Sequence, residues 1–373
     1  MTGKPTITDI SCQAVRISPQ TQWTFIEVTD SDGLVGTGEA THFGSEDPLR
    51  TFANIWDQRL TGLPAEPEAL APWFGSPPSG LPERAVLCAI EQALWDISGQ
   101  RSYQPVADLL GDRVRDVVSV YANTNRGTVD RSPEGFVAAT GLAVDAGFDH
   151  VKIAPFDDVG EGKVDDEALF SAGLERIEAV NAACAGRTGV MVDCHWRLDE
   201  TRTIALLDKA AALGLYWIEC PLPETEAHFT ALGRIAAHAK SVGVRLAGME
   251  HGLSPQDFQP YIDNRIYDVL MPDVKYCGLS ALRTIADMAA PKGIAVSPHN
   301  PTGPVCHVAS VQVSAILKNF LMLEFQFGES SLFFDIVTGD LVPPDGNTPV
   351  FTQPGLGVAL DHDCIARLSQ NGT

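Results

Sequence analysis

The sequence predicts an α/β protein in which a closed barrel of parallel strands follows a smaller α+β unit. Two observations lead to this prediction. Short apolar segments that end on an ionisable residue recur every 23 to 31 residues over the second two-thirds of the chain. That interval accommodates one strand, one helix and two loops. The first part of the chain instead alternates apolar and polar residues, as antiparallel strands do, before its period becomes helical.

The clearest repeated segment is 189–193, an apolar run that ends at Asp193 and is followed by His195. We expect a buried strand that brings both side chains to one place, because alternate residues share a face. Five later segments follow the same plan and end at Glu219, Glu250, Asp273, His299 and Glu324. Parallel strands with polar groups at one end are typical of a barrel whose active site lies on its C-terminal face. An open doubly wound sheet is the alternative, but the even spacing favours a closed ring.

The remaining elements are assigned in chain order. Ahead of the barrel we expect strands at 7–17, 24–28 and 34–40, an irregular Pro- and Gly-rich stretch at 62–82, and a helix over about 83–97 that Gly99 stops. The first two barrel strands are expected at 118–122 and 150–154. Helices are expected near 133–146, 166–183, 200–213, 224–241, 279–290 and 303–317. Residues 1–115 would form the α+β unit, 116–335 the barrel and 336–373 a C-terminal segment.

Composition limits the classes of partner. The chain has 373 residues and a formal net charge of −22, which argues against nucleic acid and against anionic membrane surfaces. An anionic substrate stays possible, because a bound divalent cation can reverse the local field. No apolar signal segment opens the chain and no apolar run approaches about 20 residues. The eight cysteines are scattered, as expected for reduced thiols, so we expect a cytoplasmic protein.

Three of the strand-end acids predict a metal site. Asp193, Glu219 and Glu250 would stand on three adjacent strands. Their oxygen ligands suit Mg2+, with Mn2+ as an alternative, whereas zinc more often recruits His or Cys. A single acid of this kind is more often a solvated loop carboxylate. Three in series favour a metal, because clustered carboxylates need a cation to offset their repulsion.

The next strand ends predict proton-transfer chemistry. A carboxylate at Asp273 bonded to one imidazole nitrogen of His299 would fix the tautomer and make the other nitrogen a general base. The alternative is a structural His–Asp pair that braces two loops. Glu324 could bond a substrate oxygen or line the barrel mouth, and Lys152 on the second strand could bind a substrate carboxylate or join an ion pair. The sequence leaves these roles open.

Taken in order, these residues closely resemble the mandelate racemase subgroup of the enolase superfamily. The resemblance spans nearly the whole chain. It includes Thr37-Gly38-Glu39-Ala40, the helix segment 89–96 (AIEQALWD), the segment 297–304 (SPHNPTGP) and the tail Pro354-Gly355-Leu356-Gly357. It implies a (β/α)7β modified TIM barrel under an N-terminal α+β capping domain, with the C-terminal segment 336–373 returning to the cap. It also implies Mg2+ at the three acids, removal of the proton α to a substrate carboxylate, and an enediolate that the metal stabilises.

Two departures within the resemblance narrow the reaction. Members with a K-x-K motif on the second strand use its second lysine as a base, but here Lys152 holds the first position and Ala154 the second. Asp193-Cys194-His195 matches the D-x-H of sugar-acid dehydratases similar to galactonate dehydratase, in which the histidine is the general acid. One base at His299 and one acid at His195 are what β-elimination of water requires. The resemblance therefore implies a sugar-acid dehydratase that yields a 2-keto-3-deoxy acid.

Alternatives stay open beside this expectation. An epimerase, racemase or cycloisomerase on the same enediolate would use Lys152 or Lys275 as a base, and a retained metabolite-binding barrel would use none of these groups catalytically. By family analogy, four further residues would contact a small-molecule carboxylate substrate: Arg197, Trp196, His42 and Thr41. Packing of Trp196 and His42 at the cap interface is the plainer interpretation of both. A homo-oligomer is expected from the resemblance alone.

Overall fold

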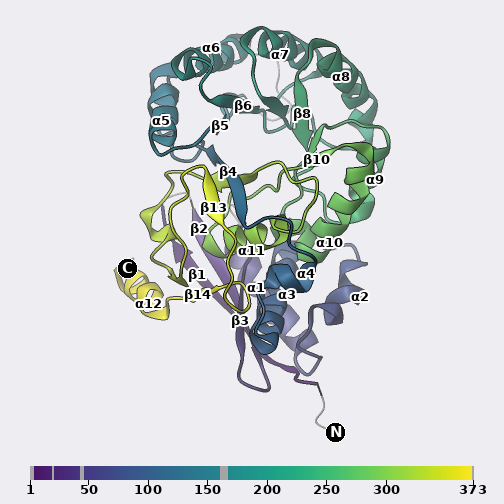
Figure 1. Ribbon diagram of the computed structural model, residues 1–373, viewed down its shortest axis with the longest axis vertical. Helices are drawn as coiled ribbons and strands as arrows, with labels where there is room; N and C mark the ends of the chain where they lie inside the picture. Colours follow the sequence, from purple (N-terminus) through teal and green to yellow (C-terminus); the bar gives the residue numbers. More distant parts are fainter. Residues whose placement is uncertain (1–3, 19–20, 43–45, 160–166, 372–373) are drawn as a thin grey trace.

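The computed structural model describes residues 4–18, 21–42, 46–159 and 167–371. A ring of helices around a curled parallel sheet occupies one end of the molecule, and the cap with both chain termini occupies the other (Figure 1). In the cap, three antiparallel strands pack against two long helices. The cap elements are β1 (Ile7–Arg16), β2 (Gln22–Asp30), β3 (Val35–Glu39), α1 (Glu46–Leu60) and α3 (Leu81–Ser102).

Glycines set the close packing of the cap sheet on its main helix. A Cβ built at Gly38 would lie 1.9 Å from the carbonyl oxygen of Ala89, and one at Gly36 2.0 Å from that of Ala93. Only glycine therefore lets β3 lie directly on α3. The stretch at 62–82, expected to be irregular, contains one short 3-10 turn, η1 (Pro67–Leu70), and one helical turn, α2 (Ala71–Phe74).

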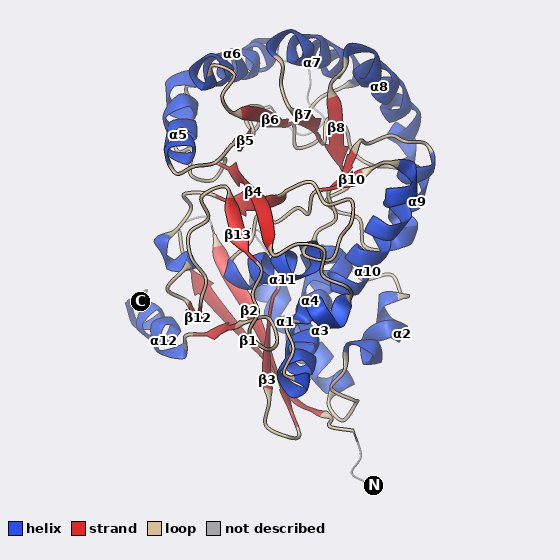
Figure 2. Cartoon of the chain, in the orientation of Figure 1, coloured by secondary structure: helices blue, strands red, loops and turns tan. Residues whose placement is uncertain are grey.

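The barrel alternates strands and helices along the chain (Figure 2). Its parallel strands are β4 (Val117–Asn123), β5 (His150–Ile153), β6 (Gly189–Asp193), β7 (Trp217–Glu219), β8 (Arg245–Gly248), β9 (Val269–Leu270), β10 (Ala295–Val296) and β11 (Leu323–Gln326). Its helices are α5 (Pro133–Asp145), α6 (Glu167–Cys184), α7 (Glu200–Leu213), α8 (Phe229–Val242), α9 (Pro255–Asp263), α10 (Val274–Ala289) and α11 (Pro304–Ser314). The 3-10 turns η2 (Glu226–His228) and η3 (Ala290–Lys292) precede α8 and follow α10.

The sheet closes into a ring. β11 pairs in parallel with β4, and a parallel bridge joins Val296 at the end of β10 to Phe320 just before β11. This closure confirms the predicted (β/α)7β barrel and excludes the open doubly wound sheet. The barrel interior is filled by inward-facing side chains, as in other closed parallel barrels. Tyr121 and Trp217 meet there edge to face, with ring centroids 5.5 Å apart.

One barrel helix was not predicted from the sequence. α9 lies between β8 and β9, where no helix was expected. It begins with a capping box in which Ser254 and Asp257 satisfy each other's backbone N–H groups, followed by Pro255 in the first turn. α10 also starts earlier than expected, at Val274, because a non-helical Gly278 (φ 81°) joins a first turn to the predicted segment.

The C-terminal segment lies against both units. β13 (Asn347–Pro349) pairs antiparallel with β4, while β12 (Val337–Gly339) pairs with β14 (Val358–Leu360) ahead of α12 (His362–Asn371). Gly355 adopts a left-handed φ of 76°, and a Cβ there would lie 2.0 Å from Asp96 Oδ1. Asp96 on α3 accepts the Leu356 N–H at 2.8 Å, which fixes the tail to the cap.

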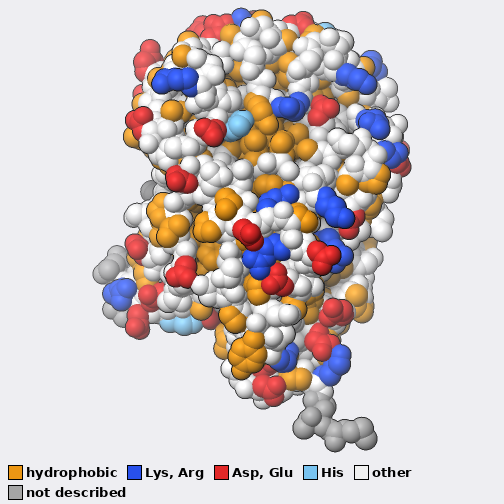
Figure 3. Space-filling model, in the orientation of Figure 1, with side chains coloured by type: hydrophobic (Ala, Val, Ile, Leu, Met, Phe, Trp, Pro, Cys, Tyr) orange, Lys and Arg blue, Asp and Glu red, His pale blue; other side chains and the backbone are white. Residues whose placement is uncertain are grey.

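Charged side chains are spread around the rim of the barrel on the face shown in Figure 3, and hydrophobic side chains occupy its centre. In the part of the chain that the structure describes, no helix is both long and apolar enough to cross a membrane.

The cap and the barrel are joined by a buried carboxylate. Glu39 at the end of β3 accepts the N–H groups of Gly303, Val305 and Cys306 at 2.6, 3.1 and 3.0 Å. These groups form the N-terminus of α11, whose dipole favours a negative charge there. Burial nevertheless raises the pKa of Glu39, so the bond network offsets a desolvation cost.

We predict that Glu39→Ala loosens the cap from the barrel. Three buried N–H groups would lose their acceptor, which should cost about 3 kcal/mol in the free energy of unfolding. Urea unfolding followed by circular dichroism measures this loss. Glu175→Ala, on the exposed face of α6, is the matched control and should change stability little; an equal effect of both variants would contradict the prediction.

Candidate active site

Three acids converge at the C-terminal end of the barrel. Asp193 ends β6, Glu219 ends β7, and Glu250 follows β8 by two residues. One ligand oxygen from each lies within 4.8 Å of the others, and all three residues are buried. The adjacent strands β6, β7 and β8 pair in register, so their ends point to the same place. This group is called the carboxylate triad below.

The backbone turns sharply just beyond these strand ends. Four non-glycine residues there adopt left-handed conformations: His195 (φ 46°), Trp196 (57°), Cys220 (43°) and Met249 (74°). Such residues are uncommon and cluster at functional sites, where surrounding contacts hold them. The structure therefore gives a reason other than strand alternation for the closeness of Asp193 and His195. The strand ends at Asp193, and the turn, not strand alternation, brings the imidazole back to the carboxylate.

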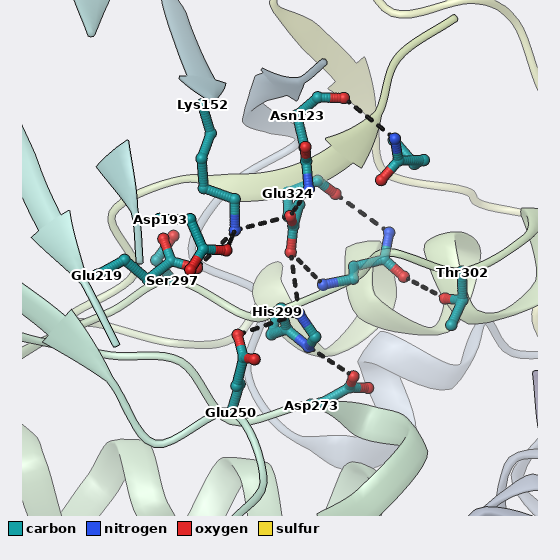
Figure 4. A network of polar contacts seen from close by, with 12 residues as sticks. Asn123, Lys152, Asp193, Glu219, Glu250, Asp273, Ser297, His299, Thr302 and Glu324 are labelled. Carbon is teal, nitrogen blue, oxygen red and sulfur yellow. Dashed lines mark hydrogen bonds and ion pairs between the residues drawn. The ribbon is translucent and has the colours of Figure 1, made fainter. Parts of the chain in front are cut away.

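Lys152 and a fourth carboxylate complete the buried charge cluster (Figure 4). Lys152 Nζ on β5 lies 2.6 Å from Glu219, 2.8 Å from Glu324 on β11 and 3.6 Å from Asp193. Burial opposes the charge on Lys152, but Glu219 and Glu324 outweigh burial and raise its pKa well above the usual value. Asn123 at the end of β4 donates to Glu324 at 2.6 Å.

The residues present fit a divalent cation. Burial and the neighbouring carboxylates raise the pKa of Glu219 well above its usual range, so one lysine does not balance the cluster. Glu250 Oε2 is buried and makes no hydrogen bond, and His299 Nε2 lies 3.2 Å from it. Three hard oxygen ligands with one uncommitted buried oxygen are the donor set that Mg2+ or Mn2+ takes. Asp193, Glu219 and Glu250 would hold the ion.

His299 and Asp273 form a close pair just beyond the ends of β10 and β9. His299 Nδ1 lies 2.8 Å from Asp273 Oδ2, while Nε2 faces Glu250. Burial alone would raise the pKa of Asp273, but Lys275 and His299 hold it below the usual value. Burial alone would lower the pKa of His299, but Glu250 and Glu324 raise it. A cation bound to the triad would counter the field that raises the pKa of His299.

His195 is held between two carboxylates on the opposite side of the triad. Its Nε2 lies 3.0 Å from Asp193 Oδ2, and its Nδ1 lies 2.7 Å from Asp157 in the loop after β5. Burial opposes its charge, but Asp193 and the hydrogen bond to Asp157 raise the pKa of His195 well above the usual value. Both carboxylates therefore favour the protonated form of His195.

A cavity of about 790 Å³ opens beside these groups. It is bordered by Asp193, Glu250, His195 and His299, and by three of the residues expected to contact substrate: Thr41, His42 and Trp196. Arg197, the fourth, does not line this cavity; its guanidinium donates to the carbonyl oxygen of Val159 at 2.5 Å. Lys152, Asp273 and Glu324 do not line the cavity but contact lining residues, Lys152 through Asp193 and the two acids through His299. Glu219 does not line it either and pairs with Lys152.

Sequence reasoning missed several residues of the site. Asn123 follows the apolar strand predicted at 118–122, so the strand-end pattern could have identified it. Arg126 and Arg131 also line the cavity, but they lie in the loop after β4, where nothing in the pattern distinguishes them. Asp157 likewise follows β5 in a loop, and only the folded chain shows that it meets His195.

The fold and the site define a barrel enzyme with its acid cluster at the C-terminal strand ends under a capping domain. Residues 8–111 match the mandelate racemase / muconate lactonizing enzyme N-terminal domain, and residues 136–364 match the enolase C-terminal domain-like family. The chain belongs to this mandelate racemase / muconate lactonizing enzyme family of the enolase superfamily, and it is an enzyme.

Curated relatives match nearly the full chain. A D-xylonate dehydratase of Haloferax volcanii is 27% identical over 377 residues, covering 96% of this chain and 88% of the relative. A D-galactonate dehydratase of Variovorax paradoxus is 28% identical over 370 residues, covering 95% and 93%. Among solved structures, a mandelate racemase/muconate lactonizing enzyme-like protein from Rubrobacter xylanophilus is 27% identical with a TM-score of 0.87, covering 98% of both chains. These matches confirm the resemblance predicted from the sequence.

We predict that His42 stays neutral down to acidic pH. Burial, followed by the charge of Lys275, lowers its pKa to about 4, and His42 Nδ1 lies 2.7 Å from the Tyr276 hydroxyl. A lowered pKa favours the neutral imidazole, so His42 should not titrate between pH 8 and 5, although a free histidine titrates near about 6.5. Nitrogen-15 NMR of histidine-labelled protein, assigned with His42→Gln, measures this. A His42 midpoint near pH 6.5 would contradict the prediction.

Proposed function

We propose that the protein is a Mg2+-dependent dehydratase of a sugar acid with a single carboxylate. The observation that carries this proposal is the placement of two imidazoles at opposite ends of the carboxylate triad. His299 Nε2 lies 3.2 Å from Glu250, and His195 Nε2 lies 3.0 Å from Asp193. A substrate carboxylate at the triad would have one histidine near its α-carbon and the other near the following carbon.

The chemistry follows from that placement. His299 Nε2 takes the proton on the carbon beside the carboxylate, while Asp273 at Nδ1 fixes the ring and stabilises its positive charge. The divalent ion would stabilise the negative charge that develops on the substrate carboxylate. Lys152 adds a buried positive charge beside Glu219 and Glu324. His195 gives its proton to the departing hydroxyl, so water leaves and an enol remains, which rearranges to the 2-keto-3-deoxy acid.

The cavity favours an acid with one carboxylate. Among the residues that the structure describes, each lysine and arginine that lines it is already paired with an acid: Arg126 with Glu329 at 3.1 Å, Arg131 with Asp157 at 3.2 Å and Lys275 with Asp273 at 3.4 Å. A second carboxylate would find no unpaired cation among these lining side chains, and burying a charge without a partner is costly. The D-xylonate and D-galactonate dehydratases that match this chain are named for acids of this kind.

An epimerase, racemase or cycloisomerase is the alternative, and the site favours it less. Such a reaction on the same intermediate would use Lys152 or Lys275 as a base. Both lysines are buried beside carboxylates that raise their pKa, which keeps them protonated. Ala154, which follows β5 at the position of the second lysine of the K-x-K motif, offers no base.

A cytoplasmic location also belongs to the proposal. All eight cysteines are free thiols, which suits a reducing compartment. A homo-oligomer stays a prediction from the family resemblance.

The proposal predicts two different outcomes for the two histidines. In D2O with Mg2+ and a panel of five- and six-carbon aldonates plus one hexose diacid, the native enzyme should dehydrate one or more monoacids but not the diacid. His299→Asn should lose both water elimination and deuterium exchange at the α-carbon, by roughly 10²- to 10⁴-fold. His195→Asn should lose elimination but keep exchange, because it removes only the acid.

Mass spectrometry of the products measures elimination and exchange together. His238→Asn, a histidine on the outer face of the barrel that pairs with Asp208, is the control and should behave like the native enzyme. Exchange without water loss by the native enzyme would select the epimerase or racemase. No reaction with any acid would refute the sugar-acid assignment.

A further inference from the structure

A second cavity adjoins the candidate active site. Its volume is about 680 Å³, and it is lined by residues after β7 and β8 and by α9, among them Glu224, Gln256 and Tyr261. Trp196 and His251 line this cavity and the active-site cavity alike. Their rings pack against each other with centroids 4.6 Å apart. The two side chains therefore form a partition between the cavities, and Trp196 is its larger part.

The partition stands where the substrate chain would continue. In the proposed reaction the carboxylate lies at the triad, the α-carbon near His299 and the carbon that loses hydroxyl near His195. Later carbons would continue beyond His195, and Trp196, which follows it in the sequence, lines the same cavity. The backbone of Trp196 is left-handed (φ 57°), and its indole N–H donates to Glu224 at 2.7 Å. The wall that this indole forms would meet the far end of the acid.

Glu224 fixes the indole from behind. Its Oε2 accepts the Trp196 Nε1–H at 2.7 Å, and its Oε1 accepts the Met249 N–H at 2.8 Å and the Tyr267 hydroxyl at 3.1 Å. Cys220 Sγ adds a weaker contact at 3.6 Å. One carboxylate thus joins the segments that follow β6, β7 and β8 to the segment just before β9.

A glycine leaves the space that the Glu224 carboxylate occupies. A Cβ at Gly248, the last residue of β8, would lie 2.7 Å from Glu224 Oε1 and 2.6 Å from the Tyr267 ring. Backbone and indole N–H groups can only donate, so the position requires an acceptor on both oxygens. Glutamine offers one acceptor and one donor. The glutamine oxygen would accept from the Met249 N–H and the Tyr267 hydroxyl. Its NH2 group would face the indole N–H, so only the hydrogen bond to Trp196 would be lost.

We infer that Glu224 is a positioning residue that holds Trp196 as the end wall of the active-site cavity and thereby limits the length of the acid that the enzyme accepts. The inference rests on the proposed function, since it takes the first cavity as the substrate site. Removing the indole would join two cavities of about 790 and 680 Å³. The combined space would admit an aldonate that carries a second sugar ring.

The experiment compares three acids: a five-carbon aldonate, a six-carbon aldonate and cellobionate, an aldonate extended by a glucose ring. Steady-state kcat and KM are measured for the native enzyme, Glu224→Gln, Trp196→Ala and the double variant. The native enzyme should turn over a short acid and not cellobionate. Trp196→Ala should raise KM for the short acid roughly ten-fold, change kcat less, and gain turnover of cellobionate.

Glu224→Gln should raise KM in the same direction and add nothing in the Trp196→Ala background, because it acts through the indole. Glu226→Gln, an exposed acid two residues away, is the matched control and should leave all values unchanged. A merely structural role of Glu224 would lower the unfolding temperature and kcat in both backgrounds alike.

The outcomes separate the two proposals. An active native enzyme whose KM values and acid-length preference survive both substitutions would overturn the inference alone. An equal effect of Glu224→Gln on KM in the native and the Trp196→Ala backgrounds would also overturn the inference alone. A native enzyme inactive on all acids would overturn the proposed function, and the length limit with it.

Discussion

The burial of negative charge at one end of the barrel is the constraint on which the rest of the structure depends. Asp193, Glu219, Glu250 and Glu324 are at most 3% exposed, and the buried Lys152 pairs with three of them, all but Glu250. Carboxylates in such surroundings repel one another and lose hydration. They stay ionised only where nearby positive charges offset these costs. Lys152, His195 and His299 are placed around the cluster, and a divalent ion at the triad would supply the remaining positive charge.

That constraint also explains why both units of the fold are needed. The barrel supplies the acids and histidines, but its open end would leave them in water. The cap closes part of this end with Thr41 and His42, which border the same cavity as His299. Glu39, two residues before Thr41, bonds to the N-terminus of α11, and Thr41 itself donates to Glu39 at 2.6 Å. The contact that joins the two units thus positions the cap residues of the site.

The strand ends could be predicted because their sequence signal is local. An apolar run that stops at an ionisable residue marks one strand, and the ring follows from repetition, as for Asp193 and Glu219. Helix α9 also has a local signal, the capping sequence Ser254-Pro255-Gln256-Asp257. The apolar pattern of this helix is too short to mark it as a helix. Other features needed the folded chain. Asp157 meets His195, and Glu224 meets Trp196, across distances in sequence that no pattern encodes.

The roles of individual residues were harder to predict than their positions, because a role also depends on contacts that form only in the folded chain. Lys152 was equally compatible with a substrate contact and an ion pair, and the structure shows the ion pairs with Glu219 and Glu324. Arg197 was expected at the substrate by analogy, yet its guanidinium bonds to Val159. A long side chain can reach several partners, and its choice depends on loops whose course the strand and helix periods do not determine.

We propose that the carboxylate triad holds one divalent cation. Calorimetric titration of Mg2+ and Mn2+ into EDTA-treated protein tests it most directly, with Asp193→Asn as the comparison and circular dichroism to show that both chains are folded. We expect one ion bound per native chain and loss of that binding in Asp193→Asn. Absence of binding to the folded native chain, or equal binding to both, would contradict it.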